Sequence, residues 1–214
     1  VGDIGIPSSV LDTIQPRTFV NNPLLWHVRF PEWRDHKYDR GHLVVYAGQM
    51  PGAAVLAANA ARRAGAGMVT ILTPAAKGSL CPPLGSVSVP PGLIVKTVAD
   101  TACVTSLIRG RKVRAWVIGP GAGYETSLRD LVMSLLKTAC PLVLDADALT
   151  VFHDDPRFHD DPGVLRAAIQ ASQSPVVVTP HEGEFKKICP HINKGSRLDR
   201  GTSCGEVVAG HGRL

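Results

Sequence analysis

The stretch from Leu43 to Leu72, LVVYAGQMPGAAVLAANAARRAGAGMVTIL, decides the fold class. It opens with an apolar run of strand length, Leu43–Ala47, and closes with a second one, Met68–Leu72. Between them Pro51 occupies the first helical position that proline favours, and an alanine-rich segment continues until Gly65. This order of strand, helix and strand predicts a complete βαβ unit.

The same alternation continues along the chain. Apolar runs predict further strands at 115–118, 141–144 and 175–179, and helical spacing predicts helices at 127–138 and 164–171. A weaker helical pattern covers 99–109, and the Pro/Gly-rich segment 82–92 predicts a loop or hairpin. Short apolar strands alternating with helices are typical of a parallel sheet covered on both faces. We therefore expect an α/β fold with a mainly parallel sheet and right-handed crossovers.

The composition narrows the class of protein. The chain has 214 residues, of which 44% are hydrophobic, enough to build the core of an α/β domain. Neither a membrane-spanning run nor a signal-peptide pattern is present, so we expect a cytoplasmic protein without a membrane partner. The five scattered cysteines, with no C-x-x-C pair, favour reduced thiols. Basic residues gather at 27–42, but no nucleic-acid-binding motif accompanies them, so we expect a solvated loop and no nucleic-acid partner.

Polar residues collect at four points, each directly after a predicted strand. These segments are Gly48–Ala53, Gly119–Gly123, Asp145–Asp147 and Thr179–Glu184. Because the carboxyl ends of parallel strands share one edge of a sheet, the four segments should converge where open α/β sheets bind their ligands. We therefore predict a crevice with glycines for close backbone approach, two or three carboxylates and one imidazole.

Each segment also has a purely structural interpretation. Gly119–Gly123 is not the G-x-G-x-x-G fingerprint; it is either a turn that needs positive φ or a group of backbone N–H donors for an anion. Asp145 and Asp147 either cap a helix or contribute charge to the pocket. A lone histidine such as His181 is commonly structural, but the carboxylates beside it weaken that interpretation.

Taken in order, these motifs resemble the C-terminal dehydratase domain of the NAD(P)H-hydrate repair enzymes, within the ribokinase-like superfamily. The resemblance runs from Asn22 to Cys189 and rests on HKY at 36–38, PGAA at 51–54, RAGAGMVT at 63–70, VIGPG at 117–121, LDADAL at 144–149 and TPHEGEF at 179–185. Residues 3–7 resemble the end of the epimerase domain that precedes the dehydratase in fused bacterial versions. The implied domains are an epimerase-like tail and linker at 1–21, the N-terminal part of the dehydratase domain at 22–189, and an atypical tail at 190–214.

The resemblance implies a lyase that uses ADP, or ATP in some members, to dehydrate hydrated NADH and NADPH. It implies Mg²⁺ as cofactor, a fused or preceding epimerase domain, and a homo-oligomer as a further possibility. Ala53, Gly121 and His181 match positions that contact the hydrated dinucleotide. The further pocket candidates, whose acids are assigned to pocket electrostatics or water-mediated Mg²⁺ binding, are Gly52, Gly119, Gly123, Asp145, Asp147, Glu182 and Glu184; no direct metal ligand is assigned.

The sequence departs from the family pattern after the last predicted strand. The family continues with a Leu-Lys-Gly segment and a Gly-Thr-Gly-Asp motif that supplies the catalytic aspartate, and neither motif occurs here. We therefore expect the C-terminal part of the fold to be missing, which leaves open whether this chain is active or inactive. We expect residues 190–214 to be out of frame or otherwise unrelated to the family. Two alternatives stay open: a ribokinase-like kinase acting on a vitamin-precursor alcohol, and a non-catalytic fragment.

Overall fold

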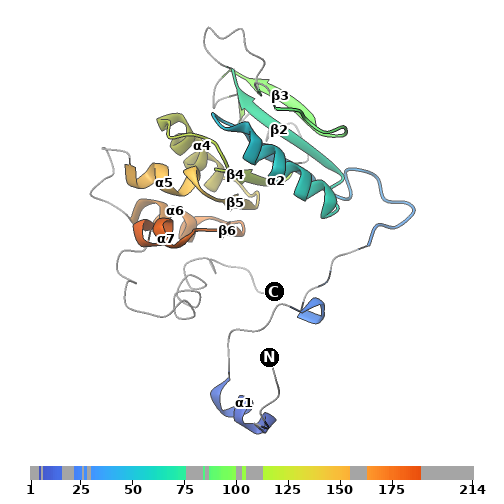
Figure 1. Cartoon of the computed structure of the whole chain (residues 1–214), viewed down its shortest axis with the longest axis vertical. Helices are drawn as coiled ribbons and strands as arrows, with labels where there is room; N and C mark the ends of the chain where they lie inside the picture. The colour runs from blue at the N-terminus through green and yellow to red at the C-terminus, as the bar shows by residue number, and fades with distance from the viewer. Residues whose placement is uncertain are drawn as a thin grey trace.

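A six-stranded, wholly parallel sheet forms the centre of the molecule (Figure 1). The computed structural model describes residues 5, 7–15, 22–25, 27, 30–75, 84, 87–99, 103–104, 113–154 and 163–188. The strand order is β3-β2-β1-β4-β5-β6. The strands are β1 (His42–Tyr46), β2 (Met68–Pro74), β3 (Ile94–Val98), β4 (Val113–Ile118), β5 (Leu142–Leu144) and β6 (Val176–Val178).

Helices cover both faces of this sheet, as the sequence predicts. Figure 1 shows α2 over β1 and β2, and α4 to α7 grouped over the half formed by β4, β5 and β6. Two short elements precede the sheet and lie away from it in this view. The bounds are α1 (Ser8–Ile14), η1 (Pro23–Leu25), α2 (Pro51–Arg63), α4 (Thr126–Leu136), α5 (Asp147–Asp154), α6 (Gly163–Ala171) and α7 (Glu182–Ile188).

The alternation of side chains along β1 divides the core in two. Val45 and Ala47 pack with α2 in one buried cluster. Val44 and Tyr46 belong to the other cluster, which includes the buried side of α4. The apolar residues of α4 recur at helical spacing, and Leu131 and Leu135 are fully buried. Successive residues of a strand point to opposite faces, so a continuous apolar run can serve two cores at once.

Five observed elements are absent from the list of predicted strands and helices: α1, η1, β3, α5 and α7. β3 carries Lys96 and is partly exposed at the sheet edge, so it lacks the wholly apolar pattern used to find strands. α5 and α7 begin inside the polar motifs, at Asp147 and Glu182; the structural interpretation of Asp145 and Asp147 as helix caps agrees with α5. The helix predicted at 99–109 lies largely outside the described residues; of the residues described there, 103 and 104 are helical.

The far edge of the sheet is β6, and its two faces differ. Val176 is buried, whereas Val177 is 47% exposed. Val177 lies beside Val143, which lies beside Val117, on the face that α2 covers over β1 and β2. Among the described residues, that face is therefore less covered toward β6. Within the same ranges, no helix has the length and apolarity needed to cross a bilayer.

Burial of the Tyr46 phenol links stability to alkaline pH. Burial raises the pKa of Tyr46 above its ordinary value of 10.0, and the charge of Glu125 adds to the increase. A raised folded-state pKa gives stability that is complete below pH 10.0 and is lost as pH rises through the folded-state value. We expect Tyr46→Phe to lose less stability between about pH 8 and pH 11 than the unchanged chain does. Urea midpoints at both pH values measure this; equal losses in the two proteins would contradict it.

Candidate functional site

Three of the four strand-end segments contact one another at the carboxyl edge. The loop after β1 meets the loop after β4, where the Met50 N–H donates to the Gly121 carbonyl at 2.9 Å. The loop after β5 starts against β4, with the Asp145 N–H donating to the Ile118 carbonyl at 3.1 Å. The convergence predicted for these three segments is therefore present, and it is made by backbone groups.

Glycine allows this contact between backbones. Gly119, Gly121 and Gly123 have φ of 118°, 65° and 86°, in the region that disfavours other residues. A Cβ on Gly119 would overlap the Asp145 carbonyl, and one on Gly121 would overlap the Met50 carbonyl. The turn interpretation of this segment is thus satisfied. α4 begins only at Thr126, so these glycines precede the helix start rather than forming it.

Asp147 ties the start of α5 to the glycine segment. Its Oδ2 accepts a hydrogen bond from the Gly123 N–H at 2.8 Å, and the residue is 5% exposed. As the first residue of α5, it also lies where the helix dipole favours a negative charge. In the loop between β5 and α5, Ala146 adopts a φ of 46°, a strained conformation for a non-glycine residue. Asp147 therefore organises the loops, and Asp145 before it is half-buried.

The fourth segment follows β6 and ends in the first turn of α7. The Thr179 N–H donates to the Leu144 carbonyl at 3.2 Å, which extends the pairing with β5. His181 then lies directly before α7, with its side chain 72% exposed. Its ring and the buried carboxylate of Glu184 are 3.2 Å apart. The exposed Glu182 pairs instead with Lys186, at 3.4 Å.

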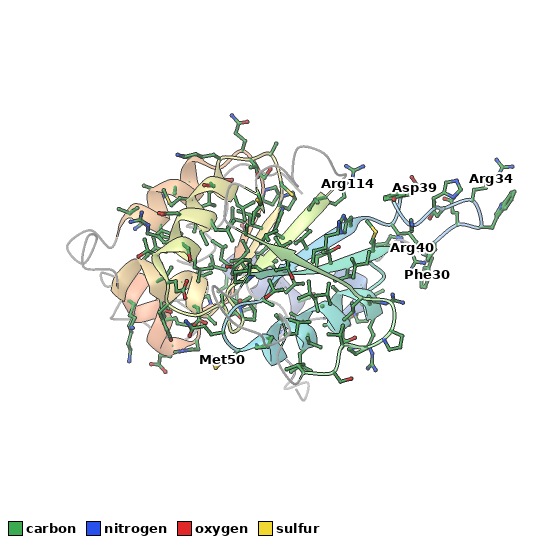
Figure 2. All side chains as sticks on the ribbon, turned by 90° about the horizontal axis from the view of Figure 1, so that it is seen from above. Phe30, Arg34, Asp39, Arg40, Met50 and Arg114 are labelled. Carbon is green, nitrogen blue, oxygen red and sulfur yellow. The ribbon has the colours of Figure 1, made fainter. Side chains whose placement is uncertain are left out.

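The residues predicted to contact the dinucleotide all lie at the carboxyl edge of the sheet, but they follow different strands along that edge. Gly52 and Ala53 are in the first turn of α2, next to Met50, and thus beside Gly121. His181 follows β6, which is separated from β4 by β5. Figure 2 shows Met50 well apart from Phe30, Arg34, Arg40 and Arg114. Arg34 and Arg40 of segment 27–42 therefore lie away from the loop that carries Met50.

The four candidate acids do not form a metal site in the described part of the chain. No group of three or more His, Cys, Asp or Glu side chains suited to a metal ion occurs there. Asp147 and Glu184 are engaged with backbone N–H groups, and Glu182 with Lys186. The described residues thus do not fit a directly bound Mg²⁺, and no chemical step is derived through one.

A groove that the sequence did not reveal lies at the opposite edge of the sheet. It has a volume of about 450 Å³ and lies between the segment before β1 and the end of α2. Its lining includes the exposed Phe30 together with Asp39 and Arg40. The signal that could have found it is the run of aromatic residues in segment 30–38. The crevice expected at the carboxyl edge stays a prediction.

The glycine contacts predict a sharp difference between two alanine substitutions. Gly119→Ala places a Cβ against the Asp145 carbonyl at a positive φ, and we expect a loss of roughly 2–4 kcal/mol. Gly52→Ala is the matched control, because its Cβ would meet nothing within 4 Å and it lies in a helix. The control should be neutral or gain up to about 1 kcal/mol. Urea unfolding measures both, and equal midpoints would contradict the close-approach interpretation.

The hydrogen bond from the Gly123 N–H to Asp147 predicts that stability depends more on an acceptor oxygen at position 147 than on its negative charge. Asp147→Ala leaves the buried Gly123 N–H without its acceptor and should cost about 1–3 kcal/mol. Asp147→Asn keeps an acceptor oxygen and should lose less, about 0.3–1 kcal/mol for the charge at the helix start. Chemical denaturation with amide exchange at Gly123 measures the difference. Equal losses for Ala and Asn would show that this hydrogen bond does not matter.

Comparisons with known proteins agree with this architecture. A family model described as NAD(P)H-hydrate dehydratase matches residues 43–209, and so extends past Cys189. The chain is 36% identical over 172 residues to the bifunctional NAD(P)H-hydrate repair enzyme of Synechocystis sp., covering 76% of this chain and 29% of that protein. For the enzyme of Salinibacter ruber the identity is 31% over 216 residues, covering 94% and 37%. The chain thus spans about a third of the length of these relatives.

Two solved structures share the fold. A ribokinase-like superfamily protein from Enterococcus faecalis aligns with a TM-score of 0.61 at 20% identity, over 85% of this chain and 59% of that one. The ADP/ATP-dependent NAD(P)H-hydrate dehydratase of Bacillus subtilis, co-crystallized with ATP/Mg²⁺, aligns with a TM-score of 0.53 at 27% identity, over 81% and 54%. The α/β, ribokinase-like fold and the family resemblance are both confirmed. The chain belongs to the NAD(P)H-hydrate dehydratase family.

Proposed function

We propose that the carboxyl edge of this sheet binds hydrated NADH or NADPH, as the substrate site of an ADP- or ATP-dependent dehydratase, a lyase. The observation that supports this most is the contact among the loops after β1, β4 and β5. This is the edge at which open α/β sheets bind ligands. It also carries the three residues that match dinucleotide contacts in the family, Ala53, Gly121 and His181.

The start of α2 suits the phosphates of such a ligand. α2 has 13 residues, and its N-cap residue, Met50, makes no side-chain capping hydrogen bond. The N–H groups of a helix's first turn have no partner within the helix, and the helix dipole favours an anion there. Ala53 is exposed in this turn, beside the loop that carries Gly121. A dinucleotide pyrophosphate at this point would be held by backbone donors.

The nucleotide co-substrate and Mg²⁺ enter the proposal through the relatives. The dehydratase of Bacillus subtilis was co-crystallized with ATP/Mg²⁺. In the proposed reaction, ADP or ATP transfers its terminal phosphoryl group to the hydroxyl on the hydrated nicotinamide ring and leaves as AMP or ADP; loss of phosphate and a proton then restores the dinucleotide. In this proposal the described residues bind the hydrated dinucleotide. We assign the phosphoryl transfer to none of them.

The relatives also support a domain order. Both bacterial enzymes compared above are named as bifunctional, and this chain spans about a third of their length. We propose that residues 22–189 belong to the dehydratase domain, that residues 1–21 are the end of an epimerase domain with its linker, and that residues 190–214 are an atypical tail. A homo-oligomer remains part of this proposal.

The test is equilibrium binding of purified hydrated NADPH to the full chain. We expect saturable binding that His181→Ala and Ala53→Glu each weaken at least tenfold, about 1.4 kcal/mol. The second change places a negative charge where the phosphates are expected. Arg114→Ala is the control, because Arg114 is exposed on β4 near its amino end, away from Met50 in Figure 2.

Turnover is measured in the same samples by adding ADP and Mg²⁺ and following recovery of reduced nicotinamide absorbance. Recovery that depends on nucleotide would show that this chain completes the reaction. Binding without recovery would limit its role to holding the substrate. Failure of folded protein to bind hydrated NADPH, or equal weakening by Arg114→Ala, would overturn the proposed site.

A further inference from the structure

The ring of His181 forms part of the N-terminal cap of α7. Its Nδ1 accepts hydrogen bonds from two backbone N–H groups, those of Gly183 at 3.0 Å and Glu184 at 3.4 Å. These donors belong to the first turn of α7, whose N–H groups have no partner within the helix. His181 therefore serves the helix through Nδ1, while most of its side chain stays exposed.

Glu184 completes the cap from the other direction. Its Oε2 accepts the His181 backbone N–H at 2.9 Å, and its Oε1 lies 3.2 Å from the ring Nε2. Side chain and backbone of the two residues thus bond reciprocally, as in a capping box, with histidine in the position usually held by Ser or Thr. Glu184 is only 6% exposed, so its carboxylate is held between these two donors rather than by water.

This arrangement fixes where the ring proton is. A neutral imidazole has one protonated nitrogen and one acceptor nitrogen. Because Nδ1 accepts from the Gly183 N–H, the proton of the neutral ring is on Nε2, where it faces the Glu184 carboxylate. Both ring nitrogens thus have a partner within the protein, and the only hydrogen that the neutral ring could share with a ligand is the Nε2–H.

The position of the His181 ring depends on the lack of a side chain at Gly183. A Cβ on Gly183 would come within 2.9 Å of the ring Cε1 and 3.3 Å of Nδ1. The histidine ring would have to move to admit it. The sequence His181-Glu182-Gly183-Glu184 therefore contains both the acceptor that orients the ring and the space that the ring needs.

We propose that Glu184 is a positioning residue that locks His181 in the Nε2–H tautomer, which excludes His181 as the general base. The exposed ring then shares its Nε2–H between Glu184 and an acceptor oxygen of the ligand. This inference rests on the proposed function for its ligand, a hydrated nicotinamide dinucleotide, whose phosphate, hydroxyl and carboxamide oxygens all accept hydrogen bonds. The tautomer itself follows from the contacts within residues 181–184 alone.

The first measurement is the tautomer of His181 in the full chain without ligand. Long-range ¹H–¹⁵N spectra of ¹⁵N-histidine protein at about pH 8.5 distinguish the protonated from the unprotonated ring nitrogen. His181→Ala identifies the signal. We expect Nε2 to be protonated in the unchanged chain, and the tautomers to mix in Glu184→Ala and Gly183→Ala. Lys186→Ala, which removes an exposed partner of Glu182 in the same helix, should leave the signal unchanged.

The second measurement is the affinity of the same proteins for hydrated NADPH. We expect about tenfold weaker binding for Glu184→Ala and Gly183→Ala, a smaller loss for Glu184→Gln, which keeps an acceptor for the His181 N–H, and no change for Lys186→Ala. Circular dichroism and urea midpoints identify variants that have merely unfolded, and Glu184→Gln then carries the comparison.

The outcomes separate this inference from the function on which it rests. A protonated Nδ1 in the unchanged chain, or a tautomer that Glu184→Ala and Glu184→Gln both leave intact, would overturn the positioning role. Mixed tautomers with unchanged affinity would overturn the donor role. If the unchanged chain shows the expected tautomer but does not bind hydrated NADPH, the proposed function fails and the donor role falls with it, while the lock by Glu184 stands.

Discussion

The parallel pairing of β1 with β2 on one side and β4 on the other is the constraint on which the rest of the structure depends. Parallel neighbours cannot be joined by a tight turn, so each connection crosses a face of the sheet, and helices such as α2 take that role. The same pairing directs every strand end to one edge. Segments that lie 70 residues or more apart in the sequence, such as those of Met50 and Gly121, are thereby brought into contact.

Neighbouring strands lie only about 4.8 Å apart, so loops that leave adjacent strands at the same edge compete for space. In this chain the loops fit together because glycine, which has no side chain, occupies the points of closest contact. Gly48 lies against the Ala122 carbonyl, and Gly119 against that of Asp145. A structural requirement therefore accounts for these glycines, and Gly119, Gly121 and Gly123 are themselves buried by the packing of the loops.

The strands and helices that could be predicted from the sequence are those whose buried apolar residues recur at the spacing of a strand or a helix. β1, β2 and β4 are short and largely apolar because two cores cover them, and α4 shows its buried side as a helical period. β3 escaped because an edge strand tolerates Lys96. α7 escaped because its cap looked like a polar loop, although His181 followed three residues later by Glu184 has the spacing of a capping box.

The partners of the polar side chains could not be predicted in the same way, because spacing does not say which N–H lies opposite which carboxylate. The sequence left Asp147 as either a helix cap or a pocket charge, and the resemblance assigned Asp147 and Glu184 to pocket electrostatics or water-mediated Mg²⁺ binding. In the structure both are among the most buried charged residues of the described chain, at 5% and 6% exposure. Burying a charge is costly unless hydrogen bonds replace its hydration, and each of these carboxylates accepts a backbone N–H.

This use of the carboxylates changes the chemistry that the edge offers to a ligand. A carboxylate that already accepts hydrogen bonds within the protein repels an anionic ligand less than a free one at the surface would, because its charge is partly compensated where it lies. The donors at this edge are the first-turn N–H groups of α2 and the Nε2–H inferred for His181, which faces Glu184 on a largely exposed ring. An edge whose two most buried acids are bonded within the protein, and which offers such donors, suits the ligand proposed above, because dinucleotides are rich in acceptor oxygens whether or not their nicotinamide ring is hydrated.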